Sequence, residues 1–146
     1  RVKIAGAIGA TYVSANTYDL ARFTGHVGNV DLVYEATGAS QVSFELLKYL
    51  GANGAFILTG VPGRHGPVSI DTDLIMRNLV LKNQVLYGTV NASKKDYEQA
   101  IRDLSVFKKR WPEQVSGLIT GRHPPERAKQ LLTSAPAGIK DVVSFA

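Results

Sequence analysis

The chain has 146 residues, of which 45% are hydrophobic and 20% charged, and it contains no cysteine. This length suits about one domain, and this balance is typical of a globular rather than a disordered protein. The lack of cysteine excludes disulfides, thiolate metal sites and cysteine nucleophiles together, and it fits a reducing compartment. The apolar runs are no longer than strands, so the sequence predicts no membrane span, and its first residues do not resemble a signal peptide.

The net charge of +5 is unevenly distributed. Residues 1–72 hold five Lys/Arg and five Asp/Glu, whereas residues 73–146 hold twelve and seven. A basic half can bind nucleic acid or an anionic cofactor. The basic residues of the segment 94–110, however, fall at opposite ends of one expected helix, about 20 Å apart, and its aromatic residues fall on the expected buried face. A solvated helix is therefore favoured over a nucleic-acid patch.

Four segments are strand candidates. The first, the run ATYV at 10–13, is short. The chain begins with Arg1 rather than a start methionine, and its opening residues are typical of a helix end that leads into a strand. We therefore expect the chain to be a fragment. Three longer apolar runs are typical of strands covered on both faces. These runs are VDLVYEAT (30–37), AFILTGV (55–61) and QVLYGTV (84–90).

Two helices are expected between these strands. The first, residues 40–50, has Ser40 as its expected N-cap. Its apolar stripe would consist of Val42, Leu46, Leu47 and Leu50. The second, residues 70–79, has Asp71 as its cap. Its apolar face would consist of Leu74, Ile75 and Leu79.

The strongest helical pattern covers residues 94–110. Ser93 and Asp96 form an expected capping box, and three cations at the far end suit the helix dipole. The expected buried face consists of Tyr97, Ala100, Ile101, Leu104 and Phe107. The tail after Pro112 departs from the preceding alternation of strands and helices, and it could belong to a second domain. Its expected elements are a short strand in 115–120, a short helix at 124–135 and a closing strand at 139–146.

The alternation of strands and helices predicts an α/β fold, a doubly wound parallel sheet. Ligands bind such sheets beyond the carboxyl ends of the strands. Here those ends form three tips: tip 1 (residues 36–39), tip 2 (59–63) and tip 3 (89–91). Each combines a small residue with a hydroxyl or an amide. A glycine after any single strand can be merely a turn, but three similar tips in register favour a ligand site.

Other chemistry is sparse. His26, His65 and His123 have no metal-ligand spacing, and His65, in a Gly/Pro loop, is best interpreted as a surface residue. Neither a G-x-S-x-G motif nor a P-loop is present, and the pair Gly6 and Gly9 does not make a G-x-G-x-x-G fingerprint.

Three segments carry a family resemblance. VDLVYEATGA, GANGAFILTGVPG and VLYGTVNASKKDYEQAIRDL resemble the cofactor domain of medium-chain dehydrogenases, and most of all the archaeal and bacterial glucose (aldose) dehydrogenases. The shared features are ATG after one strand, LTGVPG after the next, and VN followed by a helix of the DYEQAI type. The resemblance covers nearly the whole chain.

The resemblance implies a two-domain enzyme that oxidises an alcohol or aldose hydroxyl with NAD or NADP. Residues 1–112 would be a partial NAD(P)-binding domain with an incomplete Rossmann-like sheet, and residues 113–146 would return to the catalytic domain. The fingerprint and the zinc ligands would precede Arg1. The implied partners are the cofactor, a small sugar and the N-terminal part of the enzyme, in a cytoplasmic homo-oligomer without nucleic acid or membrane. The alternative is a non-catalytic Rossmann-like binding or assembly module.

The resemblance also implies roles for the tips. The turn Thr37-Gly38 would pass the adenine-side ribose and the pyrophosphate, and tip 2 would face the nicotinamide. In tip 3, Asn91 would bond the nicotinamide or the sugar. The implied cofactor-binding residues are Thr37, Gly38, Ala39, Thr59, Gly60, Val61, Thr89 and Asn91. No catalytic residue and no metal ligand is assigned to this chain.

If Arg1 follows the second Rossmann strand, residues 11–13 should have no ladder partner in this chain. Residues 30–36 should pair with 55–60, and 55–60 with 84–90, which leaves an apolar edge on the strand at 30–36. Such an edge favours pairing with another chain, so we expect either that the missing amino-terminal part is present as a separate piece or that the isolated chain self-associates. We also expect it not to oxidise sugars by itself.

Overall fold

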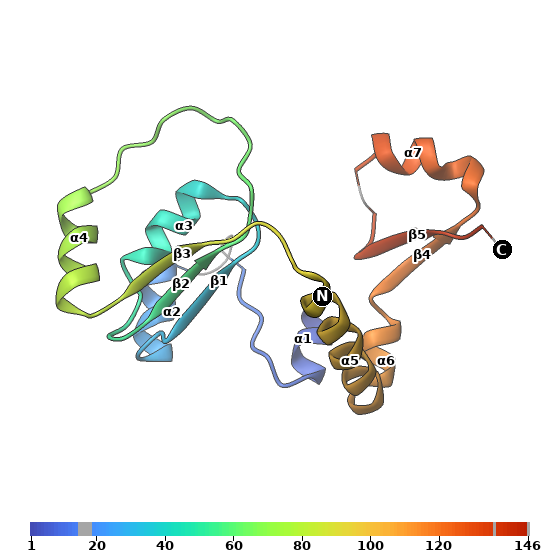
Figure 1. Cartoon of the computed structure of the whole chain (residues 1–146), viewed down its shortest axis with the longest axis horizontal. Helices are drawn as coiled ribbons and strands as arrows, with labels where there is room; N and C mark the ends of the chain where they lie inside the picture. Colours follow the sequence, from blue (N-terminus) through green and yellow to red (C-terminus); the bar gives the residue numbers. More distant parts are fainter. Residues whose placement is uncertain (15–18, 136, 146) are drawn as a thin grey trace. The chain divides into compact units, whose positions relative to one another are not determined.

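The computed structural model describes residues 1–14, 19–135 and 137–145. The chain forms two compact units, which we call the sheet unit (residues 13–91) and the terminal unit (residues 1–12 and 92–146). Figure 1 shows the elements of each unit in chain order. The last residue of the strand predicted at 139–146, Ala146, lies outside the described residues.

The sheet unit is built on a three-stranded parallel sheet of order β1-β2-β3 (Figure 1). Its strands are β1 (Leu32–Glu35), β2 (Ala55–Leu58) and β3 (Val85–Gly88). Leu32 pairs with Ala55, and Ala55 pairs with Val85. Both pairings that the sequence predicted are therefore confirmed. The helices of this unit are α2 (Leu20–Val27), α3 (Ser40–Leu47) and α4 (Thr72–Leu81).

A small core joins α3 to the sheet. Leu47, Leu50 and Phe56 are buried. Partly buried hydrophobic residues that pack around them are Val30, Val33, Phe44, Leu46, Leu58 and Ile75. Each buried side chain of this size contributes about 1.5–3 kcal/mol to folding, and Phe56 belongs to β2, the central strand of the sheet.

Two details of α3 differ from expectation. The N-cap position is Ala39, and Ser40 is already helical. The stripe is also rotated, because Val42 is exposed whereas Ser43 is buried. Burial of Ser43 is tolerated because its hydroxyl donates to the Ala39 carbonyl at 3.0 Å. In α4 the predicted cap is confirmed, since Asp71 accepts a hydrogen bond from the Leu74 amide at 2.9 Å.

The terminal unit combines helices with a two-stranded parallel ladder (Figure 1). Its elements are α1 (Val2–Ala7), α5 (Lys94–Arg110), α6 (Pro112–Ser116), β4 (Ile119–His123), the 3-10 turn η1 (Pro125–Arg127), α7 (Ala128–Thr133) and β5 (Lys140–Val143). The strand predicted in 115–120 begins late, because Pro112 starts a helix at its first position, where proline needs no amide partner.

Helix α5 has the predicted bounds and the predicted capping box. The amide and the hydroxyl of Ser93 both donate to the Asp96 carboxylate at 2.7 Å. The Ser93 hydroxyl, and then its amide, hold the pKa of Asp96 below its ordinary value. At the far end, the Arg110 guanidinium lies 4.6 Å from the centre of the Trp111 ring.

The apolar face of α5 is not buried, contrary to the prediction. Tyr97 is 65% exposed, Ile101 67% and Leu104 52%. Helical spacing fixes which residues share a face, but burial also needs an opposing surface. Near the end of α5, Phe107 lines a pocket with Ile4 of α1 and its C-cap Ile8, but this leaves the other large apolar side chains of the face mostly exposed.

Residues 10–13 do not form the predicted strand. Within the described ranges, none of them pairs with another strand. This confirms the prediction that residues 11–13 have no ladder partner in this chain. A β-strand needs a neighbour for its backbone groups, so β-forming residue types are insufficient here.

Much apolar surface is uncovered. Large hydrophobic side chains are exposed in both units, for example Val90 at 79% and Leu132 at 87%. Among the described residues, no helix is both long and apolar enough to cross a membrane.

We expect the isolated chain to self-associate through the free edge of β1. Leu32 and Tyr34 on this strand are 62% and 66% exposed, and a charged residue on an edge strand opposes pairing. Tyr34→Lys should shift sedimentation-velocity profiles, measured over a concentration series, towards the monomer. The control Met76→Lys, which replaces an exposed residue of α4, should not. A wild-type chain that is monomeric at every concentration would refute this expectation.

Candidate functional site

Tips 1 and 2 meet at the carboxyl end of the sheet. Gly38 has φ +70°, and a Cβ placed on it would lie 2.6 Å from the Val61 carbonyl oxygen. A Cβ on Gly60 would overlap the backbone of Gly38. Both glycines are therefore required for contact between the tips, and Gly38 also for its left-handed backbone.

A buried carboxylate connects these two tips. Glu35, the last residue of β1, is only 7% exposed. Its Oε1 accepts hydrogen bonds from the Thr37 amide and hydroxyl, both at 2.6 Å, and from the Gly38 amide at 2.9 Å. Its backbone carbonyl accepts from the Thr59 amide at 2.9 Å and the Thr59 hydroxyl at 2.8 Å. The same residue therefore bonds tip 1 through its side chain and tip 2 through its backbone.

These bonds stabilise the ionised form of Glu35. The Thr37 hydroxyl is the largest cause that lowers its pKa below the ordinary value, and the backbone amides of Thr37, Gly38 and Gly60 add to it. Burial acts in the opposite direction but does not prevail. Glu35 is not among the site residues predicted from the sequence. Its signal was a carboxylate in an otherwise apolar strand, two residues before Thr37-Gly38.

The Glu35 bonds change what the predicted site residues can offer a ligand. The hydroxyl protons of Thr37 and Thr59 are both given to Glu35, and the Ala39 amide donates to the Thr37 hydroxyl at 3.1 Å. The side chains that remain available to a ligand are those of exposed tip residues. Val61 is 80% exposed, and the Asn91 side chain is exposed and has no hydrogen-bond partner within the described ranges.

Tip 3 follows the neighbouring strand. The Thr89 amide donates to the Leu58 carbonyl at 3.0 Å, which continues the ladder between β2 and β3 to the start of this tip. The structure thus joins tips 1 and 2 directly and places Thr89 beside the end of β2, while Asn91 extends into solvent. His65 is exposed in the loop after tip 2.

A small cavity of about 110 Å³ lies at the joined tips. It is lined by Glu35, Gly38, Ser40, Ser43, Phe44, Leu58, Gly60 and Pro62. Pockets for small molecules usually measure about 300–1,000 Å³. A ligand of cofactor size would therefore lie across the tips rather than inside this cavity.

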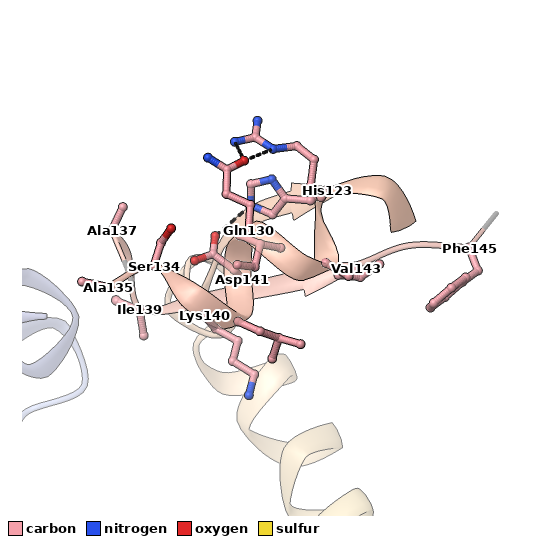
Figure 2. Close-up of a pocket in the computed structure, with 14 residues that line it drawn as sticks. His123, Gln130, Ser134, Ala135, Ala137, Ile139, Lys140, Asp141, Val143 and Phe145 are labelled. Atoms are coloured by element: carbon pink, nitrogen blue, oxygen red, sulfur yellow. Dashed lines mark hydrogen bonds and ion pairs between the residues drawn. The ribbon is translucent and has the colours of Figure 1, made fainter.

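A larger cavity, of about 670 Å³, belongs to the terminal unit. It lies between α7 and the β4–β5 ladder, and Figure 2 shows His123 and Asp141 facing one another in it, with Nε2 and Oδ1 3.0 Å apart. A Cβ on Gly121 would overlap both side chains, so this glycine makes room for the pair. The cavity contains none of the predicted site residues, and Leu132 and Phe145 on its wall are mostly exposed.

Comparisons with known proteins agree with this fold. A family model described as "Glucose dehydrogenase C-terminus" matches residues 1–145. Glucose 1-dehydrogenase of Methanocella arvoryzae is 27% identical over 99% of this chain and 40% of its own length. Glucose 1-dehydrogenase 2 of Haloterrigena turkmenica is 32% identical over 94% of this chain and 38% of its own length. The chain thus spans about 40% of the length of these relatives.

Solved structures are similar as well. Haloferax mediterranei glucose dehydrogenase in complex with NADP, Zn and gluconolactone matches with a TM-score of 0.84 and 27% identity, over 99% of this chain and 40% of that protein. Benzyl alcohol dehydrogenase from Acinetobacter calcoaceticus matches with a TM-score of 0.76 and 19% identity, over 99% of this chain and 40% of that protein. This likeness shows the fold alone.

Gly60→Ala should destabilise the sheet unit. The new Cβ would overlap backbone atoms of Gly38, and forced overpacking costs about 1–3 kcal/mol. The control Gly25→Ala adds a Cβ in open space within α2, where alanine favours the helix by about 0.5–1 kcal/mol. Urea unfolding of both variants checks this, and equal stabilities would contradict the proposed contact between the tips.

Glu35 should make the stability of the sheet unit depend on pH in the acid range. Its pKa is lower in the folded than in the unfolded chain, so the stabilisation is complete above the unfolded value of about 4.5 and disappears as the pH falls through the folded value. Thr37→Val removes the largest cause and should move this pKa back up. A carboxyl-carbon NMR titration measures the change, and an identical titration in Thr37→Val would be the contrary result.

Proposed function

Because the chain belongs to the glucose dehydrogenase C-terminal family, we propose that it forms the carboxyl-terminal part of an NAD(P)-dependent dehydrogenase that oxidises glucose or a similar aldose. The family match over residues 1–145 is the observation that carries this proposal. The joined tips at the carboxyl end of a parallel sheet support it, because this edge is where such sheets bind ligands.

The tips offer groups that suit a nicotinamide cofactor. We assign Thr37, Gly38 and Ala39 to the ribose and pyrophosphate side, where backbone atoms and small side chains allow close approach. Thr59, Gly60 and Val61 would face the nicotinamide, and the exposed apolar side chain of Val61 suits a flat ring. Thr89 and Asn91 in tip 3 are the remaining proposed cofactor-binding residues.

Asn91 would contact both the nicotinamide and the sugar. Its amide supplies two donors and an acceptor, and these are unengaged in the described part of the chain. When bound, the nicotinamide cofactor supplies the chemistry of hydride transfer. The residues of this chain would bind and orient it.

A catalytic zinc is part of the proposal, with its ligands outside this chain. Across the ranges 1–14, 19–135 and 137–145, no three His, Asp or Glu residues form a group that could bind a metal ion. We keep the division into a cofactor domain (residues 1–112) and a segment that returns to the catalytic domain (residues 113–146) as part of the proposal, together with a cytoplasmic homo-oligomer.

The test is an assay of the whole protein. With glucose and NAD or NADP, it should form reduced nicotinamide, measured by absorbance. The 146-residue chain assayed alone should form none, because its sequence holds no pyrophosphate fingerprint. A whole protein inactive on every aldose tested would refute the proposed substrate class, and activity of the chain alone would refute its incompleteness.

Asn91→Ala should lower kcat/KM of the whole protein. The loss of a hydrogen bond to cofactor or sugar costs about 1–3 kcal/mol of transition-state stabilisation. Stability should not change, because Asn91 is exposed and follows the strand. Asn91→Asp, which keeps the acceptor and loses the donors, shows which end of the amide matters. The control Gln99→Ala removes an exposed amide of α5. Equal values of kcat/KM in Asn91→Ala and Gln99→Ala would exclude a hydrogen bond from Asn91 to the cofactor or the sugar.

A further inference from the structure

Glu35 is placed where one residue contacts both tips. Its carboxylate receives three hydrogen bonds from tip 1, of 2.6, 2.6 and 2.9 Å. Its backbone carbonyl receives the Thr59 amide and hydroxyl, as well as the Gly60 amide at 3.2 Å. Short bonds from amides and hydroxyls to an ionised carboxylate are roughly twice as strong as neutral ones.

The contact between the tips leaves little freedom for either. The second carboxylate oxygen, Oε2, would lie 2.6 Å from a Cβ on Gly60, so the carboxylate packs directly against tip 2. Gly38 is equally close to the Val61 backbone. A rotation of the Glu35 side chain would therefore release Thr37 and Gly38 on one side and uncover Gly60 on the other.

Glu35 itself does not face outward. It is 7% exposed and lines the small cavity at the tips, whereas Val61 and Asn91 are exposed and available to a ligand. An effect of Glu35 on a cofactor would therefore act through the backbone positions of tips 1 and 2.

We propose that Glu35 is a positioning residue for the cofactor surface: it holds tips 1 and 2 in one rigid arrangement and thereby sets cofactor affinity rather than the rate of the chemical step. This inference rests on the proposed function. It adds a residue that never contacts the cofactor to the residues assigned above.

Glu35→Gln in the whole protein tests the proposal. This substitution keeps the size of the side chain and an oxygen that can accept from Thr37 and Gly38, but it removes the charge that strengthens these bonds and puts an NH2 group in place of the oxygen that packs against Gly60. The dissociation constant for NADP, measured by fluorescence titration, should rise about tenfold. At saturating cofactor, kcat should change less than about twofold. The lost interactions would stabilise the bound ground state and the transition state equally, so their loss weakens binding without slowing the chemical step. The control Glu45→Gln removes an exposed carboxylate of α3 and should change neither value.

A second readout follows the tips directly. In the 146-residue chain, amide hydrogen exchange at Thr37, Gly38 and Gly60 should become faster in Glu35→Gln and remain unchanged in Glu45→Gln. If Glu35→Gln does not fold, Thr37→Val removes one bond to the carboxylate and should raise the NADP dissociation constant, while Thr37→Ser keeps the hydroxyl and should restore it.

The outcomes separate this inference from the proposed function. An unchanged NADP dissociation constant in Glu35→Gln, with binding intact in the wild type, overturns the positioning role alone. A lower kcat with unchanged affinity also overturns it. Failure of the wild-type whole protein to bind NAD or NADP overturns the proposed function and removes the basis of this inference with it.

Discussion

Parallel pairing of β1, β2 and β3 is the constraint on which the candidate site depends. In a parallel sheet all carboxyl ends lie at the same edge, so three segments that are far apart in sequence come together there. The register of Leu32 with Ala55 and of Ala55 with Val85 keeps these ends level. Tips 1 and 2 can then touch, and the Thr89 amide of tip 3 can continue the ladder.

The contact between tips 1 and 2 combines a steric and an electrostatic requirement. Glycine at positions 38 and 60 lets the two backbones approach to a distance at which a Cβ would collide. Glu35 then satisfies the amides that this close approach would otherwise leave buried without partners. A buried carboxylate is unfavourable unless it is fully hydrogen-bonded, and here three donors from tip 1 supply that compensation.

Each of the two units exposes apolar side chains. The apolar face of α5 and the outer edge of β1 are exposed, and the buried hydrophobic core found in the described ranges has three residues. Relatives that the chain matches are about two and a half times as long, since it spans about 40% of them. These bare faces support the proposal that further parts of an enzyme cover them.

The sequence by itself determined the local elements whose signals are local. The bounds of α5, its capping box at Ser93 and Asp96, and the cap at Asp71 follow from short-range hydrogen bonds. The three apolar runs determined the strands and, with right-handed crossovers, their parallel order. The family resemblance also came from the sequence, because its motifs lie in contiguous segments.

The tertiary structure alone decided which surfaces are covered and which groups meet. Within the described ranges, residues 10–13 lack a strand partner, most of the apolar face of α5 is exposed, and α3 buries Ser43 in place of Val42. The role of Glu35 was equally hidden, because its bonds to tip 2 join residues 24 positions apart. Residue types and spacing report what a segment can do locally, whereas burial and long-range hydrogen bonds depend on what lies opposite it, and only the folded chain supplies that neighbour.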